Sequence, residues 1–214
     1  MTDKQYRAWL RIRLEDLVKH CNLGKDGFKK KINSEEINRR LQALAVESDK
    51  RTPGESVAAV SGVLSRVGKR ISLKVEATHT PSEYFVTREG LYVWSDFKDR
   101  VLKNATPTES GTSFKLDTFK LEKDASDEQI ESSLPKKHLF SETEVCAIVA
   151  ELTSKQSKGE EGVLLNNGYA NLFYTESFVV HVDWSSSGRG WGVYAWRRDD
   201  SGWFGGVRVV SPAH

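Results

Sequence analysis

The sequence has few cysteines and no long apolar run, and each absence excludes a class of protein. Only Cys21 and Cys146 occur in 214 residues, and they lie far apart. A disulfide framework or a zinc site needs more cysteines or closer spacing, so we expect two buried thiols in a reducing compartment. No apolar run approaches the ~20 residues that span a bilayer, and the polar first residues lack the apolar middle of a secretory signal. The sequence therefore predicts a cytoplasmic protein without a membrane segment.

Motifs for catalysis and cofactor binding are also missing. The chain contains no HExxH, CxxC, GxSxG or Walker pattern. Among the five histidines, His181 has the most suitable neighbour, because Asp183 follows two residues later and shares its face of a strand. Such a pair could act in acid–base chemistry or bind a metal, but two ligands do not make a metal site. We therefore predict no catalytic residue, no metal and no cofactor, and whether His181 and Asp183 are buried stays open.

What is present is a composition that supports a packed core. Hydrophobic residues make up 38% of the chain, charged residues 29% and aromatic residues 10%, and the net charge is +2. Intrinsic disorder goes with few aromatic residues and a high net charge, so we expect a folded chain. Its length suits one large domain or two small ones.

The charge is divided unevenly along the sequence. Residues 1–80 contain 17 Lys or Arg and 10 Asp or Glu, which gives a net charge of +7, whereas residues 81–214 contain 15 and 20 and have a net charge of −5. Such asymmetry between the two parts of a chain is typical of contact with nucleic acid. The first part is therefore the candidate surface for a polyanion.

Helices are predicted for most of this basic part. Apolar residues recur at three- and four-residue intervals over residues 4–22 and 55–67. A further helix is expected after Asn33, because Asn33 can cap it and Glu36 can reach back as in a capping box. We therefore expect a basic helical region over residues 1–70.

One stretch of this region resembles a known DNA-binding motif. Residues 14–33, LEDLVKHCNLGKDGFKKKIN, are similar to the helix-turn-helix of DNA-binding domains, with a tight turn near Asn22 and matching apolar positions at Leu17, Cys21, Leu23, Phe28 and Ile32. Val18, Asn22 and Gly27 depart from the family pattern. The resemblance implies a second helix over residues 25–32 that enters the major groove, with its lysines on phosphates. The alternative is a helical hairpin whose lysines form a solvated face.

The candidate nucleic-acid-binding residues are the basic side chains of this region that lie near the motif or close to the end of the predicted helices. They are Lys25, Lys29, Lys30, Lys31, Arg39, Arg40, Lys69 and Arg70.

The pattern changes to β-strands after residue 159. Strands are predicted over residues 169–175, 177–184, 191–196 and 203–210, and their short connections favour an antiparallel meander. Ser141 and Glu144 form a capping-box pattern that begins a helix suited to pack on this sheet. The predicted fold class is therefore α+β: a basic helical N-terminal part, then an α+β domain over residues 71–214 that ends in a four-stranded antiparallel sheet packed on a helix.

Alternation divides the strand residues between the two faces of this sheet. Phe178, Val180, Val182 and Trp184 share one face, and Val179, His181 and Asp183 share the other. A four-stranded sheet covered by one helix leaves aromatic residues exposed, and exposed Trp and Tyr beside Arg are typical of protein hot spots or of surfaces that stack single-stranded bases. The alternative is that other helices of the chain cover the second face. The candidate partner-binding residues are Trp184, Trp191, Tyr194, Trp196, Arg197, Arg198, Trp203 and Arg208.

Two functions remain open from the sequence. The first is a non-enzymatic nucleic-acid-binding protein, with DNA favoured, that uses its basic N-terminal region. The alternative is a protein-binding adaptor or inhibitor, for example one encoded by a phage or mobile element, that acts through the Trp-rich sheet. The identity of the partner, any base preference and the oligomeric state are not predicted.

Overall fold

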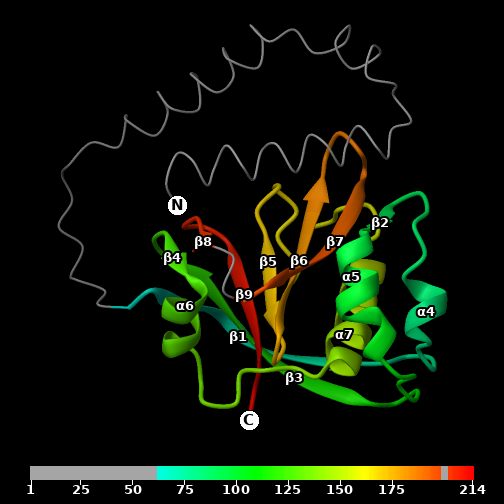
Figure 1. Ribbon diagram of the computed structural model, residues 1–214, viewed down its shortest axis with the longest axis horizontal. Helices are drawn as coiled ribbons and strands as arrows, with labels where there is room; N and C mark the ends of the chain where they lie inside the picture. The colour runs from blue at the N-terminus through cyan, green and yellow to red at the C-terminus, as the bar shows by residue number, and fades with distance from the viewer. Residues whose placement is uncertain (1–61, 199–201) are drawn as a thin grey trace, which may run out of the picture. The chain divides into compact units, whose positions relative to one another are not determined.

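The structure is a computed structural model, and it describes residues 62–198 and 202–214. Seven strands form one mixed sheet in the order β1-β3-β9-β5-β6-β7-β2 (Figure 1). They are β1 (Leu64–Lys74), β2 (Leu91–Val93), β3 (Ser113–Leu121), β5 (Asn171–Tyr174), β6 (Phe178–Ser185), β7 (Gly190–Arg197) and β9 (Arg208–Pro212). The pair β4 (Ala125–Ser126) and β8 (Gly202–Trp203) forms a second, two-stranded sheet.

Helices are few in the part of the chain that the structure describes, and all except α7 are short. They are α4 (Pro81–Tyr84), α5 (Ser95–Arg100), the 3₁₀-helix η1 (Leu102–Asn104), α6 (Asp127–Ser133) and α7 (Glu142–Lys155). Within these residues, no helix is long and apolar enough to cross a membrane.

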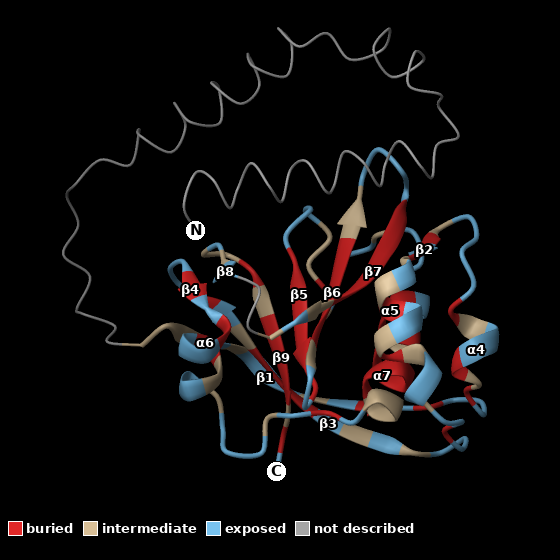
Figure 2. Cartoon of the chain, in the orientation of Figure 1, coloured by how far each residue is buried: buried red, intermediate tan, exposed pale blue. Residues whose placement is uncertain are grey.

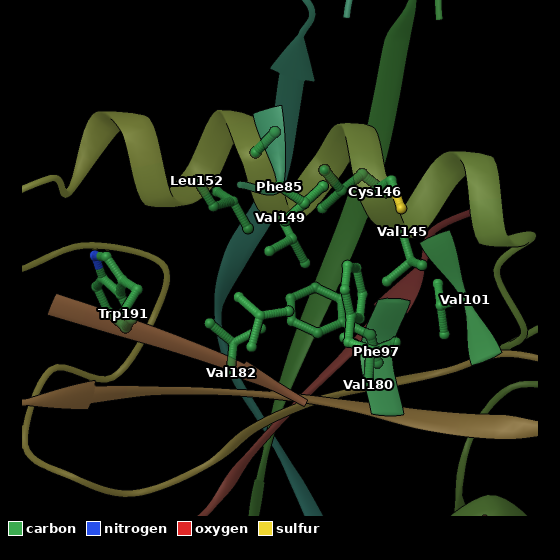
Figure 3. Close-up of a cluster of buried hydrophobic side chains, with 14 of the residues drawn as sticks. Phe85, Phe97, Val101, Val145, Cys146, Val149, Leu152, Val180, Val182 and Trp191 are labelled. Atoms are coloured by element: carbon green, nitrogen blue, oxygen red, sulfur yellow. The ribbon is translucent and has the colours of Figure 1, made fainter. Parts of the chain in front are cut away.

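The first face of the sheet is covered by α7 and α5. Side chains of α7 such as Val145 and Val149 pack with Phe97 of α5 against Val180 and Val182 of β6 (Figure 3). These positions are buried on both partners, as the red segments of α7 and the central strands show (Figure 2). Burial of this apolar area is the main source of stability for such a layer.

The second face has a separate and smaller core. Ile130 of α6 packs with Leu172 and Tyr174 of β5 and with Val179 of β6. The sheet is therefore covered on both faces. This agrees with the alternative in which another helix of the chain covers the second face. This second core places α6 and β8 over β5, β6 and β9.

The helix α7 begins where the sequence predicts it. Ser141 accepts a hydrogen bond from the Glu144 backbone N–H at 3.2 Å, and Glu144 accepts one from the Ser141 backbone N–H at 2.8 Å, so the capping box is confirmed. Cys146 lies on the buried side of this helix, and burial raises the pKa of its thiol to about 12. The expectation of a buried thiol is thus confirmed for Cys146, whereas Cys21 lies outside the described residues.

The prediction of a four-stranded antiparallel sheet is wrong. The strands β5, β6 and β7 form the expected antiparallel meander, but residues 203–210 do not continue it. Gly206 adopts a φ of 100°, which glycine tolerates readily, and ends the extended run. The following strand β9 inserts between β3 and β5 and runs parallel to β5, where Val209 and Val210 are buried. The pairing partners of a strand so far along the chain are not visible in local patterns.

The predicted helical N-terminal part is not borne out either. Leu64–Lys74 is a strand, although the helix predicted over residues 55–67 and the helical region over residues 1–70 both include its beginning. The three-residue spacing of Leu64 and Val67 also fits a helix, but both residues pair with β3 instead. Residues 1–61, which carry the rest of that prediction, lie outside the described residues. The strand β1 spans the boundary predicted between residues 70 and 71.

Candidate functional site

The strand β1 forms one edge of the sheet and carries the two predicted nucleic-acid-binding residues that the structure describes. Its pairing with β3 is interrupted between Val67 and Ile71, and Gly68 adopts a φ of 69° there. Lys69 and Arg70 follow in this bulge and are exposed. Bulges re-aim side chains at sheet edges, so this one presents Lys69 and Arg70 to solvent. The other six candidates lie outside the described residues.

A single carboxylate organises the arginines of this edge. Asp117 of β3 is buried and pairs with both Arg66 and Arg70 of β1. The hydrogen bond from Arg70 and the nearby charge of Arg66 hold the pKa of Asp117 below its ordinary value despite its burial. Arg70 also donates to the His214 backbone carbonyl at 3.0 Å. Arg70 is therefore held in place by Asp117 on β3 and by His214, which follows β9.

Positive charge gathers at this edge. Residues 62–74 and 113–123 contain seven Lys or Arg and two Asp or Glu, whereas the other described residues contain 12 and 17. We call the seven the basic edge: Arg66, Lys69, Arg70, Lys74, Lys115, Lys120 and Lys123. Lys120 pairs with Glu122 at 2.9 Å, but Lys69, Lys74 and Lys115 make no ion pair with any described residue. The edge therefore combines fixed arginines with solvated lysines.

The strands β6 and β7 place the predicted aromatic residues on two opposite faces. Trp184 pairs with Trp191 and Val182 with Val193 on the first face, and His181 pairs with Tyr194 on the second, as alternation predicts. Trp191 is 1% exposed, and its indole N–H donates to the Gln156 carbonyl at 2.6 Å. The predicted aromatic candidates thus do not share one surface.

The remaining predicted partner-binding residues differ in exposure. Tyr194 is buried and stacks on Trp94 with ring centroids 4.9 Å apart. Trp196 and Trp203 are half-buried, and Arg197 is exposed. These predicted partner-binding residues therefore do not form a continuous exposed patch.

Arg198 and Arg208, the last two candidates, are both half-buried but differ in their partners. Arg198 forms an ion pair with Glu131 of α6, which also lies 3.1 Å from His138. Arg208 donates to backbone carbonyls instead. Arg198 therefore fixes α6 against the end of β7. The charge of Arg208, in contrast, is not neutralised by any described carboxylate.

His181 and Asp183 lie together and are buried on the second face. His181 Nε2 lies 3.3 Å from Asp183 Oδ2, yet neither ring nitrogen of His181 makes a hydrogen bond with a described residue. The imidazole lies against the rings of Tyr194 and Trp203, at centroid distances of 5.1 and 5.6 Å. The pair therefore lies against aromatic rings, and the His181 and Asp183 side chains keep exposures of only 6% and 13%.

A third element of this face, Asp127 of α6, was missed by the sequence analysis. Its Oδ1 accepts hydrogen bonds from the Tyr174 hydroxyl and from the Trp203 indole N–H, each at 2.7 Å. Burial raises the pKa of Asp127 to about 6, although these two hydrogen bonds oppose the shift. The sequence did carry a signal for the start of this helix, because Ser126 and Gln129 have the spacing of a capping box, which the structure forms.

The described residues offer no metal centre. Within residues 62–198 and 202–214, no three His, Cys, Asp or Glu side chains gather closely enough to hold a metal ion.

No family model matches the chain, and searches of curated proteins and of solved structures likewise return no match.

Proposed function

We propose that this protein binds nucleic acid without acting on it chemically, and that the basic edge contacts the phosphate backbone. The observation that carries the proposal is the segregation of charge: seven basic and two acidic residues lie on β1, β3 and their ends, in a unit that is otherwise acidic. A polyanion gains affinity from such a patch by releasing condensed counterions. The basic segment over residues 1–61 would add to this affinity.

The geometry of the edge suits backbone contact better than base reading. Arg66 and Arg70 share Asp117, which neutralises part of their charge and fixes their position. The lysines are point charges on flexible side chains, which bind phosphates but discriminate poorly between bases. We therefore expect binding that depends strongly on salt and weakly on sequence.

The test is a salt titration of binding to duplex and single-stranded oligonucleotides of mixed sequence, using the full chain. The variant Lys69→Gln/Lys115→Gln removes two charges that no described carboxylate neutralises. The expected result is weaker binding to all sequences and a slope of log K against log salt that is less steep by about 2, since each phosphate contact contributes about 0.9.

A matched control separates this effect from a general loss of charge. Lys98→Gln/Lys103→Gln removes two exposed lysines of α5 and η1, which lie outside the basic edge, and should leave the slope unchanged. The proposal fails if the wild-type chain does not bind at 50 mM salt, or if both double variants lose affinity equally. If the chain instead captures a protein partner, and this capture is lost when Trp196 is replaced, the result would support the alternative function of a protein-binding adaptor or inhibitor.

A further inference from the structure

An irregular loop after α7 borders a small pocket that is open to solvent on one side. The pocket measures about 220 Å³ and is lined by Glu161, Gly162, Leu164, Leu165, Asn166 and Arg208. At about 30 Å³ for each water, this is room for roughly seven water molecules. The loop joins α7 to β5, and ordered loops of this length without secondary structure are usually functional.

Amide side chains hold the walls of this pocket in place. Gln156 is buried, and its Nε2 donates to the Glu160 carbonyl at 2.7 Å and to the Leu164 carbonyl at 3.0 Å, while its Oε1 accepts from the Leu164 N–H at 2.9 Å. Asn171 bonds in the same way to both backbone groups of Leu165, at 2.8 and 3.2 Å. The backbone of the pocket is therefore fixed before any ligand arrives, which reduces the entropic cost of binding.

Arg208 brings a half-buried positive charge to this pocket. Its Nη1 donates to the carbonyls of Gly162 and Val163. The structure gives its Nε and Nη2 no partner, and Arg208 forms no ion pair, among the residues that it describes. Burial removes part of the water around the guanidinium and lowers its pKa. A charge in such a place is stabilised by an anion.

The vacant side of the guanidinium has the geometry that anions require. Nε and Nη2 form one edge of the planar fork, which binds two oxygens of a phosphate or carboxylate at once. The two carbonyls that accept from Nη1 set the direction in which this edge faces. Glu161, the acidic residue of the lining, is exposed and therefore solvated. Arg208 is thus a positive group that the pocket partly removes from water.

We propose that this pocket binds a phosphate group through Arg208. The basic edge meets it at one position, because Arg208 of β9 lies directly opposite Lys120 of β3. A nucleic-acid strand on the basic edge would therefore bring one of its phosphates to Arg208. The choice of a nucleic-acid strand as the source of the phosphate rests on the proposed function. The inference that the pocket binds phosphate does not depend on it.

The experiment titrates the full ¹⁵N-labelled chain with inorganic phosphate, at constant ionic strength maintained with chloride, and follows the amide resonances of Gly162, Leu164 and Asn166. The expected result is saturable shifts of these resonances. Arg208→Gln should weaken phosphate binding by ten-fold or more, because it removes a charged hydrogen-bond donor. Arg197→Gln, which removes an exposed arginine at the end of β7, should have no effect.

If Arg208→Gln does not fold, the wild-type titration alone tests whether the pocket binds phosphate. The absence of saturable shifts in the wild type overturns the inference. Equal binding by Arg208→Gln and wild type also overturns it. An oligonucleotide that displaces phosphate from the pocket identifies a strand as the source. Phosphate binding without oligonucleotide binding supports the pocket and refutes the proposed function, while oligonucleotide binding without phosphate binding does the reverse.

Discussion

Replacing Asp127 with asparagine should make the stability of the protein less dependent on pH. Asp127 is 3% exposed, and its Oδ1 accepts hydrogen bonds from Tyr174 and Trp203, while its Oδ2 has no hydrogen-bond partner among the described residues. A buried carboxylate oxygen without a donor disfavours ionisation. Asparagine has nearly the same shape and keeps an oxygen for Tyr174 and Trp203, but it cannot ionise.

The magnitude follows from the shift in pKa. The pKa of Asp127 rises from 3.8 to about 6 in the folded chain. Below pH 3.8 the folded and unfolded chains both carry the proton, so no stability is lost. As the pH rises towards 6, the unfolded chain releases its proton first, and the free energy of unfolding falls. A shift of about 2 units, at about 1.4 kcal/mol for each unit, gives a total loss of about 3 kcal/mol above pH 6.

The assay is urea unfolding of wild type and Asp127→Asn at intervals from pH 4 to pH 7.5. The free energy of unfolding of Asp127→Asn, relative to that of wild type, should rise by about 2.5 kcal/mol between pH 4 and pH 7, because part of the total change already lies below pH 4. Glu128→Gln serves as the control, because it removes an exposed carboxyl from the same turn of α6. A difference between Asp127→Asn and wild type that stays constant with pH would refute this account of the buried carboxyl.

Two further predictions concern close packing. Gly192→Ala should destabilise the protein by about 1–3 kcal/mol in chemical unfolding, because its Cβ would lie 2.7 Å from both Asp183 Oδ1 and Tyr194 Cε2. Gly202→Ala is the control, since its Cβ would meet no atom of the described residues closer than 3.9 Å, and equal losses would contradict the argument. In a Cys21→Ser background, Cys146 should react with a thiol reagent at neutral pH only as the protein unfolds, because it is buried and its pKa is raised to about 12; rapid labelling of the folded chain would show that α7 is accessible.

Features set by neighbouring residues could be predicted from the sequence. The capping box of Ser141 depends on residues three apart, and the faces of β6 depend on strict alternation, so both were confirmed. The pattern around Leu64 and Val67 fits a helix as well as a strand, and only pairing with β3, some fifty residues away, decides between them. Long-range pairing overrides local preference in such segments.

The candidate site was less predictable for the same reason. Lys69 and Arg70 were chosen for their charge, but their place in a bulge and the pairing of Arg70 with Asp117 depend on how β1 meets β3. Arg208 was assigned to an aromatic interface because it lies beside the Trp and Tyr residues of the predicted sheet, whereas β9 carries it to the loop after α7. Asp127 was missed because a carboxyl at the start of a helix is normally solvated, and its burial comes from Tyr174 and Trp203.

The place of β9 in the sheet has a consequence for how the sheet assembles. Among the strands that the structure describes, the pair β1–β3 and the group β5–β6–β7–β2 join only through β9, which pairs with β3 on one side and β5 on the other. Neither part can therefore complete its hydrogen bonding until residues 208–212 are available, although these residues come last of all the strands along the sequence. Forming such distant contacts requires closing long loops first, which slows folding. Until then β3 and β5 both present open edges, and edges of this kind can pair with other chains, so aggregation during refolding should depend on how quickly this one short strand inserts.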